Sequence, residues 1–280
     1  MHTILHKEQL APDTWLMRVA APAVAAKARA GQFFLLRADD AGERVPFTFL
    51  DWDPREGWIE FVFLAVGATT RYLATFEEGD GLLDVVGPLG NPTEVSPGRW
   101  AVAGGGVGLA AAYPVARAFA QAGAQVSAIV AARTEELLIL EDRFAAIPGV
   151  ELLVVTDDGS KGERGFATMP LERLCAAGEV DAVFAVGPVP MMAACSRTAA
   201  GLGVPVTVSL NPVMLDGTGM CGGCRVTVGG EARFACIDGV DFDGSLVDWA
   251  DMAARSRAYA PEEREAAERP RRCHLRDAQL

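Results

Sequence analysis

Hydrophobic and polar residues follow two different patterns along the 280-residue chain. Up to residue 97, short alternating or apolar runs such as TWLMRV, QFFLLRA and WIEFVFLAV are separated by clusters of Asp, Gly and Pro. Runs of about four to eight residues bounded in this way are typical of strands joined by turns. We therefore predict an antiparallel sheet or small β-barrel as a first domain over residues 1–97.

From residue 98 onward, short apolar strands alternate with Ala-rich helical segments. Buried strands are expected at WAVAG, QVSAIVAA, ELLVVTDD, DAVFAVG and VPVTVSL. Helices are expected between them, at the Ala-rich stretch that ends near Ala122 and at EELLILEDRFAA, MPLERLCAAG and PMMAACSRTAAGLG. Strands that alternate with helices predict a parallel sheet with helices on both faces, here a second domain over residues 98–210.

A third segment, residues 211–265, begins with a loop rich in glycine and cysteine. This loop has little hydrophobic periodicity of its own, so something other than an apolar core is expected to hold it. DGSLVDWADMAARSRAYAPEE then predicts a helix with Asp243 or Ser245 as its cap. The charged residues 266–280 are expected to form a solvated or partner-facing tail.

Composition and charge narrow the classes of function. Half of the residues are hydrophobic and 22% are charged, which indicates a folded rather than a disordered chain. The net charge of −12 argues against a nucleic-acid partner, because phosphate binding needs clustered Lys and Arg. The amino terminus lacks a basic region followed by an apolar run, and no stretch reaches about 18 apolar residues. We therefore expect a cytoplasmic protein without a membrane span.

The six cysteines divide into two groups. Without a secretory signal, cysteines are expected to be thiols or metal ligands rather than disulfides. Cys175 and Cys195 lie in Ala-rich helical sequence and are expected to be small buried residues. Cys273 stands beside His274, and two adjacent residues make poor geometry for a metal site. The remaining three cysteines are grouped in one loop.

That loop, DGTGMCGGCRVTVGGEARFAC, has the spacing of a metal site. Four residues separate Asp216 from Cys221, two separate Cys221 from Cys224, and eleven separate Cys224 from Cys236. Plant-type [2Fe–2S] sites use C-x4-C-x2-C and a distant fourth cysteine, and a carboxylate can bind ferric iron at the first position. The spacing favours an Asp/Cys3 [2Fe–2S] cluster. Alternatives are a zinc site, a reactive thiol pair, and a plain turn role for Asp216.

A glycine run, VAGGGVGLAA, contains Gly104, Gly105, Gly106 and Gly108 between a predicted strand and a predicted helix. Such a turn directs backbone N–H groups and the helix dipole at a phosphate. Tight packing of the helix on the strand is the alternative explanation of glycines there. The position of the glycine run at the start of the alternating strands and helices favours phosphate binding. The lack of an acidic residue about twenty residues later argues against an ordinary dinucleotide fingerprint.

Two further stretches, RVPFTF and FLAVGATTRYL, are on their own an ordinary edge strand and an ordinary turn. Taken together, however, the motifs of nearly the whole chain resemble those of the ferredoxin-reductase superfamily. They follow one another in the order R-x-P-x-[ST] strand, G-x-x-T turn, GGGVGLAA, GPVPMM and cysteine loop. The resemblance is to the branch of dihydroorotate dehydrogenase electron-transfer subunits. NPVMLDGTGMCGGCRVTVGG is most similar to the small subunits of NADH-dependent reduced ferredoxin:NADP oxidoreductases, also called sulfide dehydrogenases, because dihydroorotate enzymes carry four cysteines.

The resemblance implies three sets of binding residues. The set implied for FAD comprises Arg44, Pro46, Phe47, Thr48, Phe63, Gly67, Thr69 and Thr70. The set implied for NAD(H), with NADP as an alternative, comprises Gly104, Gly105, Gly106, Gly108, Asp157, Asp158, Gly187 and Pro188. The implied ligands of the [2Fe–2S] cluster are Asp216, Cys221, Cys224 and Cys236.

Individual roles follow from the same resemblance. The strand from Pro46 to Thr48 would lie against the isoalloxazine, and Phe63 would back the flavin or its ribose. Relatives often carry Arg immediately before the proline, whereas this chain has Val45 there and Arg44 one position earlier. The Gly67 turn and the glycine run would hold the two pyrophosphates. Gly187 and Pro188 would shape the nicotinamide pocket.

The implied function is electron transfer between NAD(H), FAD and the cluster, within a ferredoxin:NADP oxidoreductase complex. Hydride transfer needs orientation rather than an acid or base, so no catalytic side chain is expected. The implied partner is a larger flavoprotein subunit with its own FAD and [4Fe–4S] clusters, through which ferredoxin would react. Any electron bifurcation would lie on that second flavin. Alternatives are a dihydroorotate dehydrogenase electron-transfer subunit and a zinc-stabilised module without redox activity.

Overall fold

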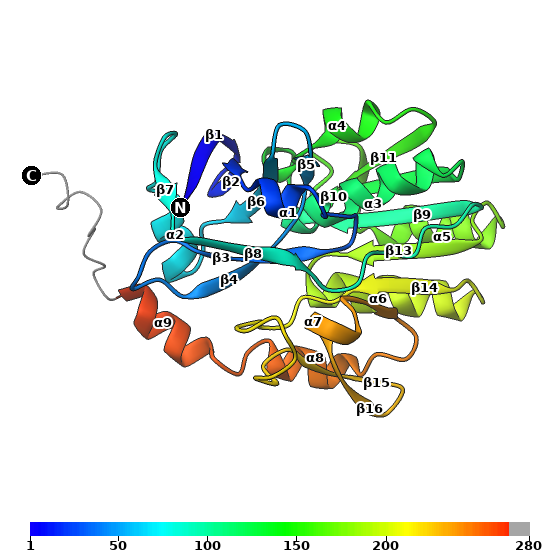
Figure 1. Cartoon of the computed structure of the whole chain (residues 1–280). Helices are drawn as coiled ribbons and strands as arrows, with labels where there is room; N and C mark the ends of the chain where they lie inside the picture. Colours follow the sequence, from blue (N-terminus) through cyan, green and yellow to red (C-terminus); the bar gives the residue numbers. More distant parts are fainter. Residues whose placement is uncertain (269–280) are drawn as a thin grey trace, which may run out of the picture.

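A computed structural model describes residues 1–268, in which two antiparallel sheets precede a large, mainly parallel sheet (Figure 1). The predicted fold class is confirmed, although the antiparallel strands form two separate sheets instead of one closed barrel. The three-stranded sheet has the order β4-β3-β8 and contains β3 (Phe33–Arg37), β4 (Arg44–Thr48) and β8 (Asp84–Leu89). The five-stranded sheet has the order β5-β6-β2-β1-β7 and contains β1 (His2–Ala11), β2 (Thr14–Ala20), β5 (Asp51–Asp53), β6 (Trp58–Leu64) and β7 (Gly81–Leu82).

An aromatic core joins these two sheets. Alternate residues of each strand point inward, so Phe34 and Phe47 from one sheet meet Phe61 and Phe63 from the other. The ring centroids of Phe47 and Phe61 are 4.9 Å apart, and those of Phe34 and Phe61 are 5.3 Å apart with the rings edge to face. Two short helices, α1 (Pro22–Ala25) and α2 (Ala68–Leu73), lie in the connections. This core gives the antiparallel part a rigid wall on which a flat ligand can rest.

The second part is a seven-stranded sheet of order β12-β11-β10-β9-β13-β14-β17. Its six parallel strands are β9 (Arg99–Gly105), β10 (Gln125–Ala132), β11 (Val150–Thr156), β12 (Glu163–Arg164), β13 (Ala182–Val186) and β14 (Val206–Ser209). One face is covered by α3 (Leu109–Gln121) and α4 (Glu141–Ala145). The other face is covered by α5 (Thr168–Ala176), α6 (Val189–Gly201) and α8 (Trp249–Arg255). Cys175 and Cys195 are buried there, as predicted.

The helix predicted at EELLILEDRFAA is wrong in its extent. Only a single 3₁₀ turn, η2 (Glu135–Leu137), and the short α4 form there. Between them Leu138 is extended and buried, Ile139 is buried, and Leu140 has a left-handed φ of 65°. The apolar residues gain more burial as an extended segment against the core than a continuous helix would give them.

The third part is more ordered than the sequence predicted. A hairpin of β15 (Arg225–Val228) and β16 (Glu231–Phe234) is followed by α7 (Ala235–Asp238) and β17 (Asp241–Asp243). β17 pairs antiparallel with β14 and so becomes the last strand of the large sheet. α8 is capped by Asp248, whose carboxylate accepts from the N–H groups of Ala250 and Asp251, so the predicted caps Asp243 and Ser245 are wrong.

The carboxy-terminal part of the described chain is α9 (Ala260–Glu268), which lies against α2. The predicted tail lies mostly outside residues 1–268, as do Cys273 and His274. Within the described residues, the longest apolar helix falls short of what a bilayer crossing requires.

Candidate functional site

A cavity of about 1060 Å³ lies between the antiparallel part and the parallel sheet. Eleven of the sixteen positions implied for FAD and NAD(H) line it, namely Pro46, Phe47, Thr48, Phe63, Thr70, Gly105, Gly106, Gly108, Asp157, Gly187 and Pro188. The other five, which do not line it, are Arg44, Gly67, Thr69, Gly104 and Asp158. Segments up to about 140 residues apart in sequence therefore meet in one space large enough for extended cofactors.

The antiparallel wall of the cavity is formed by β4 and β6. Phe47 and Phe63 are buried and pack on the aromatic core, which fixes the surface that they present. The Thr48 hydroxyl lies 3.5 Å from the carbonyl oxygen of Gln32, leaving a long hydrogen bond that a ligand can replace. Arg44 begins β4 opposite Arg37, is exposed, and lies outside the cavity lining.

The turn before α2 is closed by its own threonines. The Gly67 N–H donates to the Thr70 hydroxyl over 3.0 Å, which satisfies one of the free N–H groups at the helix start. The Thr69 hydroxyl is buried and donates to a carboxylate oxygen of Glu43 over 2.9 Å. Thr70 alone of the three implied residues reaches the cavity.

The glycines of the run differ in their surroundings, some being closely packed and one facing open space. A Cβ at Gly104 would lie 2.7 Å from the Leu109 side chain, and one at Gly108 would lie 2.7 Å from Gly187 Cα. These two glycines permit close packing of the helix and of the neighbouring turn. Gly106 differs, because its φ is +55° and no heavy atom lies within 4 Å of the position that a Cβ would take. Gly106 therefore presents open backbone to the cavity.

The far end of the cavity is formed by the carboxyl ends of β10 and β11. Arg133 and Asp157 follow these strands, are exposed, and line the cavity. Asp158 instead closes its own turn, accepting from the Ser160 hydroxyl over 2.6 Å and the Ser160 N–H over 2.9 Å. The Ser160 hydroxyl, and then its N–H, lower the pKa of the Asp158 carboxyl. Phe166, which no motif in the sequence singled out, is 64% exposed and completes this end.

The cysteine loop owes its shape to the β15–β16 hairpin. Arg225 pairs with Phe234, so Cys224 and Cys236, at the two open ends of the hairpin, come together. Their sulfur atoms are 3.2 Å apart and both residues are buried. Burial, and then the hydrogen bond with Cys224, raise the pKa of Cys236 to about 12. A double glycine between two short runs is a hairpin signal that could have been read from the sequence.

Cys221 and Asp216 lie in the preceding loop and are held by backbone groups. The Gly223 N–H donates to the Cys221 sulfur over 3.4 Å, and Cys221 is exposed. One oxygen of Asp216 accepts from the hydroxyl and N–H of Thr218 and from the Met220 N–H. The Thr218 hydroxyl makes the largest contribution to lowering the pKa of this carboxyl. These hydrogen bonds are those of a turn residue, and all three are made by one carboxylate oxygen of Asp216.

The four implied ligands are gathered in one loop system but not around one point. Within residues 1–268, no group of three or more His, Cys, Asp and Glu side chains is arranged to hold a metal ion. Cys224 and Cys236 come nearest to a metal-binding pair. Their sulfur atoms are 3.2 Å apart, whereas two thiolates on a tetrahedral ion lie about 3.8 Å apart for metal–sulfur bonds of about 2.3 Å, so metal binding would move the two sulfurs slightly apart. The Cys236 N–H also points at the Cys224 sulfur over 3.5 Å, a contact that favours a thiolate.

One layer of side chains separates the cavity from the cysteine pair. Phe33, Met214 and Val240 line the cavity. The same three residues belong to the apolar cluster that contains Cys224 and Cys236. Sequence reasoning missed all three, because no local pattern distinguishes them from ordinary core residues. A flat ligand in the cavity and a metal centre at the cysteines would therefore lie within reach of electron transfer.

Comparison with known proteins agrees with this geometry. Residues 211–248 match the iron–sulfur cluster binding domain of dihydroorotate dehydrogenase B. A dihydroorotate dehydrogenase B (NAD(+)) electron transfer subunit homolog from Thermotoga maritima is 44% identical over 96% of this chain and 95% of its own length. The corresponding subunit of Geobacillus thermodenitrificans is 30% identical over 86% of this chain and 95% of its own.

A solved structure of an NADH-dependent reduced ferredoxin–NADP oxidoreductase, studied for flavin-based electron bifurcation, contains a similar chain. It is 43% identical, superposes with a TM-score of 0.90, and the match covers 96% of this chain and 97% of the other. A ferredoxin reductase of carbazole 1,9a-dioxygenase, 21% identical with a TM-score of 0.65 over 74% of this chain and 67% of its own, shares the fold. The resemblance predicted from the motifs is confirmed. This chain belongs to the family of dihydroorotate dehydrogenase B electron-transfer subunits and their homologues.

Proposed function

We propose that this chain moves electrons between NAD(H), one FAD and one [2Fe–2S] cluster, as the smaller subunit of a ferredoxin:NADP oxidoreductase complex. The observation that carries the proposal is the shared wall of Phe33, Met214 and Val240 between the cavity and the buried cysteine pair. The similarity to the ferredoxin–NADP oxidoreductase chain supports it, as does an aspartate at the first position of the cluster loop.

The three predicted domains receive one task each in this proposal. Residues 1–97 hold the flavin, residues 98–210 hold the nicotinamide dinucleotide, and residues 211–265 hold the cluster. The backbone of Pro46 and the ring of Phe63 orient the isoalloxazine from the antiparallel wall. The turn that includes Gly67, Thr69 and Thr70 receives the FAD pyrophosphate, with Thr70 at the cavity.

The opposite wall orients the nicotinamide dinucleotide. Gly106 offers its open backbone to the pyrophosphate, while Gly187 and Pro188 form the floor beside the flavin. At the far end, Arg133, Asp157 and Phe166 surround the adenosine. The largely apolar lining excludes water from the space between the two rings. When bound, FAD accepts a hydride and releases electrons singly, so no side chain has to transfer a proton.

The cluster is held by Asp216, Cys221, Cys224 and Cys236 in this proposal. Cys224 and Cys236 would supply two neighbouring thiolates. Asp216 and Cys221 would complete the donor set, because a carboxylate and a thiolate are both ligands that ferric iron accepts. Zinc would use the same donors, which makes metal content a direct discriminator between a redox subunit and a zinc-stabilised module.

The function is tested by adding NADH to the anaerobically purified chain while recording visible absorbance. NADH is expected to bleach the flavin on the time scale of a rapid-scan instrument, at a rate that can be measured, and NADPH is expected to do so more slowly. Arg133 lines the cavity, and its guanidinium would pair with the 2′-phosphate of NADPH if the site binds that nucleotide. The comparison of NADH with NADPH therefore also tells which nucleotide the site favours. A flavin that stays oxidised with both nucleotides would contradict the proposal.

We further propose that the face around Cys221 docks the larger flavoprotein subunit, which carries its own FAD and [4Fe–4S] clusters and reacts with ferredoxin. Three apolar side chains near Cys221 are exposed to solvent: Met220 is 88% exposed, Leu215 51% and Ile237 46%. Exposed apolar side chains that cluster in this way are typical of a protein–protein interface. Residues 211–260 are expected to supply much of an interface that buries upwards of about 2,000 Å².

Changing Met220→Glu is expected to weaken the complex by about tenfold or more, because a charge would be buried at the centre of an apolar contact. Leu202→Glu, at an equally apolar position 44% exposed at the end of α6, is the matched control and should bind normally. Light scattering of the co-expressed subunits measures the effect. If both substitutions weakened the complex equally, or if neither weakened it, this face would not be the docking site.

A further inference from the structure

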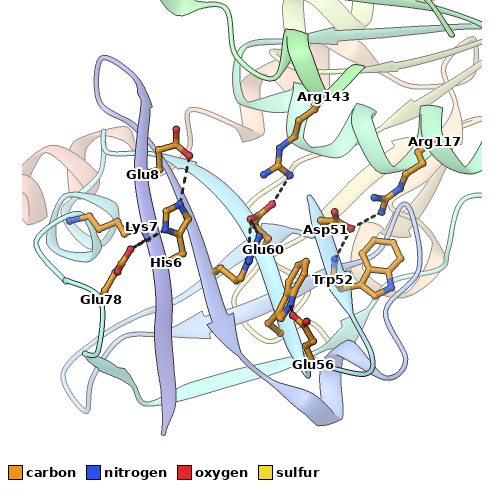
Figure 2. A network of polar contacts seen from close by, with 12 residues as sticks. His6, Lys7, Glu8, Asp51, Trp52, Glu56, Glu60, Glu78, Arg117 and Arg143 are labelled. Atoms are coloured by element: carbon orange, nitrogen blue, oxygen red, sulfur yellow. Dashed lines mark hydrogen bonds and ion pairs between the residues drawn. The ribbon is translucent and has the colours of Figure 1, made fainter. Parts of the chain in front are cut away.

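Glu60 is a buried carboxylate on β6 with an arginine on each of its two oxygens. Its side chain is 1% exposed. Arg18 of β2 donates to Oε1 over 3.0 Å. Arg143 of α4 donates to Oε2 over 2.6 Å (Figure 2). Arg18 belongs to the antiparallel part and Arg143 to the parallel part, so the carboxylate bridges the two.

This bridge is rigid. The guanidinium of Arg18 lies 4.1 Å from the centre of the Trp58 ring, so Glu60 is held from the antiparallel side whether or not Arg143 is present. Charge-assisted hydrogen bonds to a buried carboxylate are short and directional. Burying a carboxylate away from water costs free energy, and only well-placed partners offset that cost. The two arginines are therefore expected to hold Glu60 in a fixed position.

The bridge connects the two walls of the cavity. Further along β6 from Glu60, Val62, Phe63 and Leu64 line the antiparallel wall. The segment that leads into Arg143 carries Arg133, Leu137 and Ile139, which line the nucleotide wall. The Arg143–Glu60 contact therefore ties the segment between β10 and α4 to the strand that faces it across the cavity.

A second ion pair acts in parallel. Arg117 of α3 donates to Asp51 of β5 over 2.8 Å, with both side chains 24% exposed (Figure 2). α3 begins directly after the turn of Gly106 and Gly108. Both elements that follow the nucleotide-side turns, α3 and α4, are thus fastened by arginines to acidic residues of the antiparallel part.

We propose that Glu60 is a positioning residue, which sets through Arg143 the separation between the nucleotide wall and the flavin wall. The inference rests on the proposed hydride transfer between ligands on these walls. Hydride transfer requires the reacting atoms at near van der Waals contact, and a misplacement of about 1 Å costs up to about 100-fold in rate. Neither Glu60 nor Arg143 lines the cavity, so the effect is exerted on geometry alone.

Arg143→Leu tests this with little risk to folding, because Glu60 keeps its contact with Arg18. At saturating NADH, the rate of flavin reduction is expected to fall by about tenfold or more, while the Kd for NADH and the FAD content stay close to those of the unmodified chain. The long-wavelength charge-transfer absorbance of stacked nicotinamide and flavin should weaken in proportion. Arg143→Lys, which can still reach the carboxylate, should restore most of the rate, and Glu60→Gln should behave like Arg143→Leu.

The matched control is Arg173→Leu, which removes a bidentate ion pair with Glu163 inside the parallel part. It should leave the reduction rate unchanged. An unchanged rate in Arg143→Leu, or a lower rate accompanied by an equal loss of FAD and no recovery with Lys, would overturn the inference. Failure of NADH to reduce the unmodified chain would instead overturn the proposed function.

Discussion

Cys224→Ala is expected to abolish the iron–sulfur cluster while leaving the flavin and its reduction by NADH intact. Cys224 is 2% exposed and lies 3.2 Å, sulfur to sulfur, from Cys236. Removing one of the paired thiolates would leave the cluster one ligand short, and within residues 1–268 no other group of His, Cys, Asp and Glu side chains is arranged to replace it. The unmodified chain should contain about two iron atoms and two acid-labile sulfides, and the variant close to none.

The structure explains why the flavin should survive this change. Among residues 1–268, the cavity lining and the apolar cluster of the cysteine pair share Phe33, Met214 and Val240, so the rest of the wall proposed to hold the flavin should stay in place. Cys175→Ala is the matched control, since it removes a buried thiol of the parallel part and should retain full iron content. Iron and sulfide analysis after anaerobic purification measures both. Stoichiometric zinc in the unmodified chain, or full iron in Cys224→Ala, would contradict the ligand assignment.

Gly108→Ala is expected to cost about 1–3 kcal/mol of stability and most of the NADH-dependent flavin reduction. The added Cβ would lie 2.7 Å from Gly187 Cα and 2.8 Å from the carbonyl oxygen of Val186. Both neighbours are backbone atoms, so no side chain can rotate away and the two turns must separate. Both turns line the cavity, so in the proposed function their separation would move the nucleotide away from the flavin.

Gly201→Ala is the control for this substitution. Gly201 ends α6, has an ordinary φ, and no heavy atom lies within 4 Å of an added Cβ. The substitution should be neutral, or should stabilise the folded chain by about 0.4–1 kcal/mol, because alanine lowers the conformational entropy of the unfolded chain. Thermal unfolding and flavin reduction rates measure both variants. Normal stability and rate in Gly108→Ala would show that the turn tolerates a side chain.

The fold class was predictable because its signals in the sequence are local and periodic. Before residue 97, alternating hydrophobic and polar residues predicted antiparallel strands. After residue 98, apolar runs alternating with Ala-rich segments predicted a parallel sheet with helices, and the structure confirms both. Local signals failed where tertiary packing decides. At Leu138 to Leu140 a helical composition is overridden by burial of an extended segment. β17 was missed because three residues carry too little pattern, although pairing with β14 fixes them.

The candidate site was predictable to the extent that it depends on glycine, proline and cysteine. The residues that line the cavity around Gly106 were indicated by the glycine run, and those from Pro46 to Thr48 were implied by the family resemblance. Others were not, namely Phe33, Met214, Val240, Phe166 and the Glu60 bridge. They act through positions that only the folded chain brings together, and their residue types are common in any core or surface.

The most direct measurement is an anaerobic titration of the purified chain with NADH, followed by visible absorbance and electron paramagnetic resonance. The expected result is bleaching of the flavin together with the signal of a reduced [2Fe–2S] cluster. In Cys224→Ala the flavin should bleach without that signal. A chain that holds no flavin, or one whose flavin is fully reduced by NADH while its cluster stays oxidised, would contradict the relay from nucleotide to cluster.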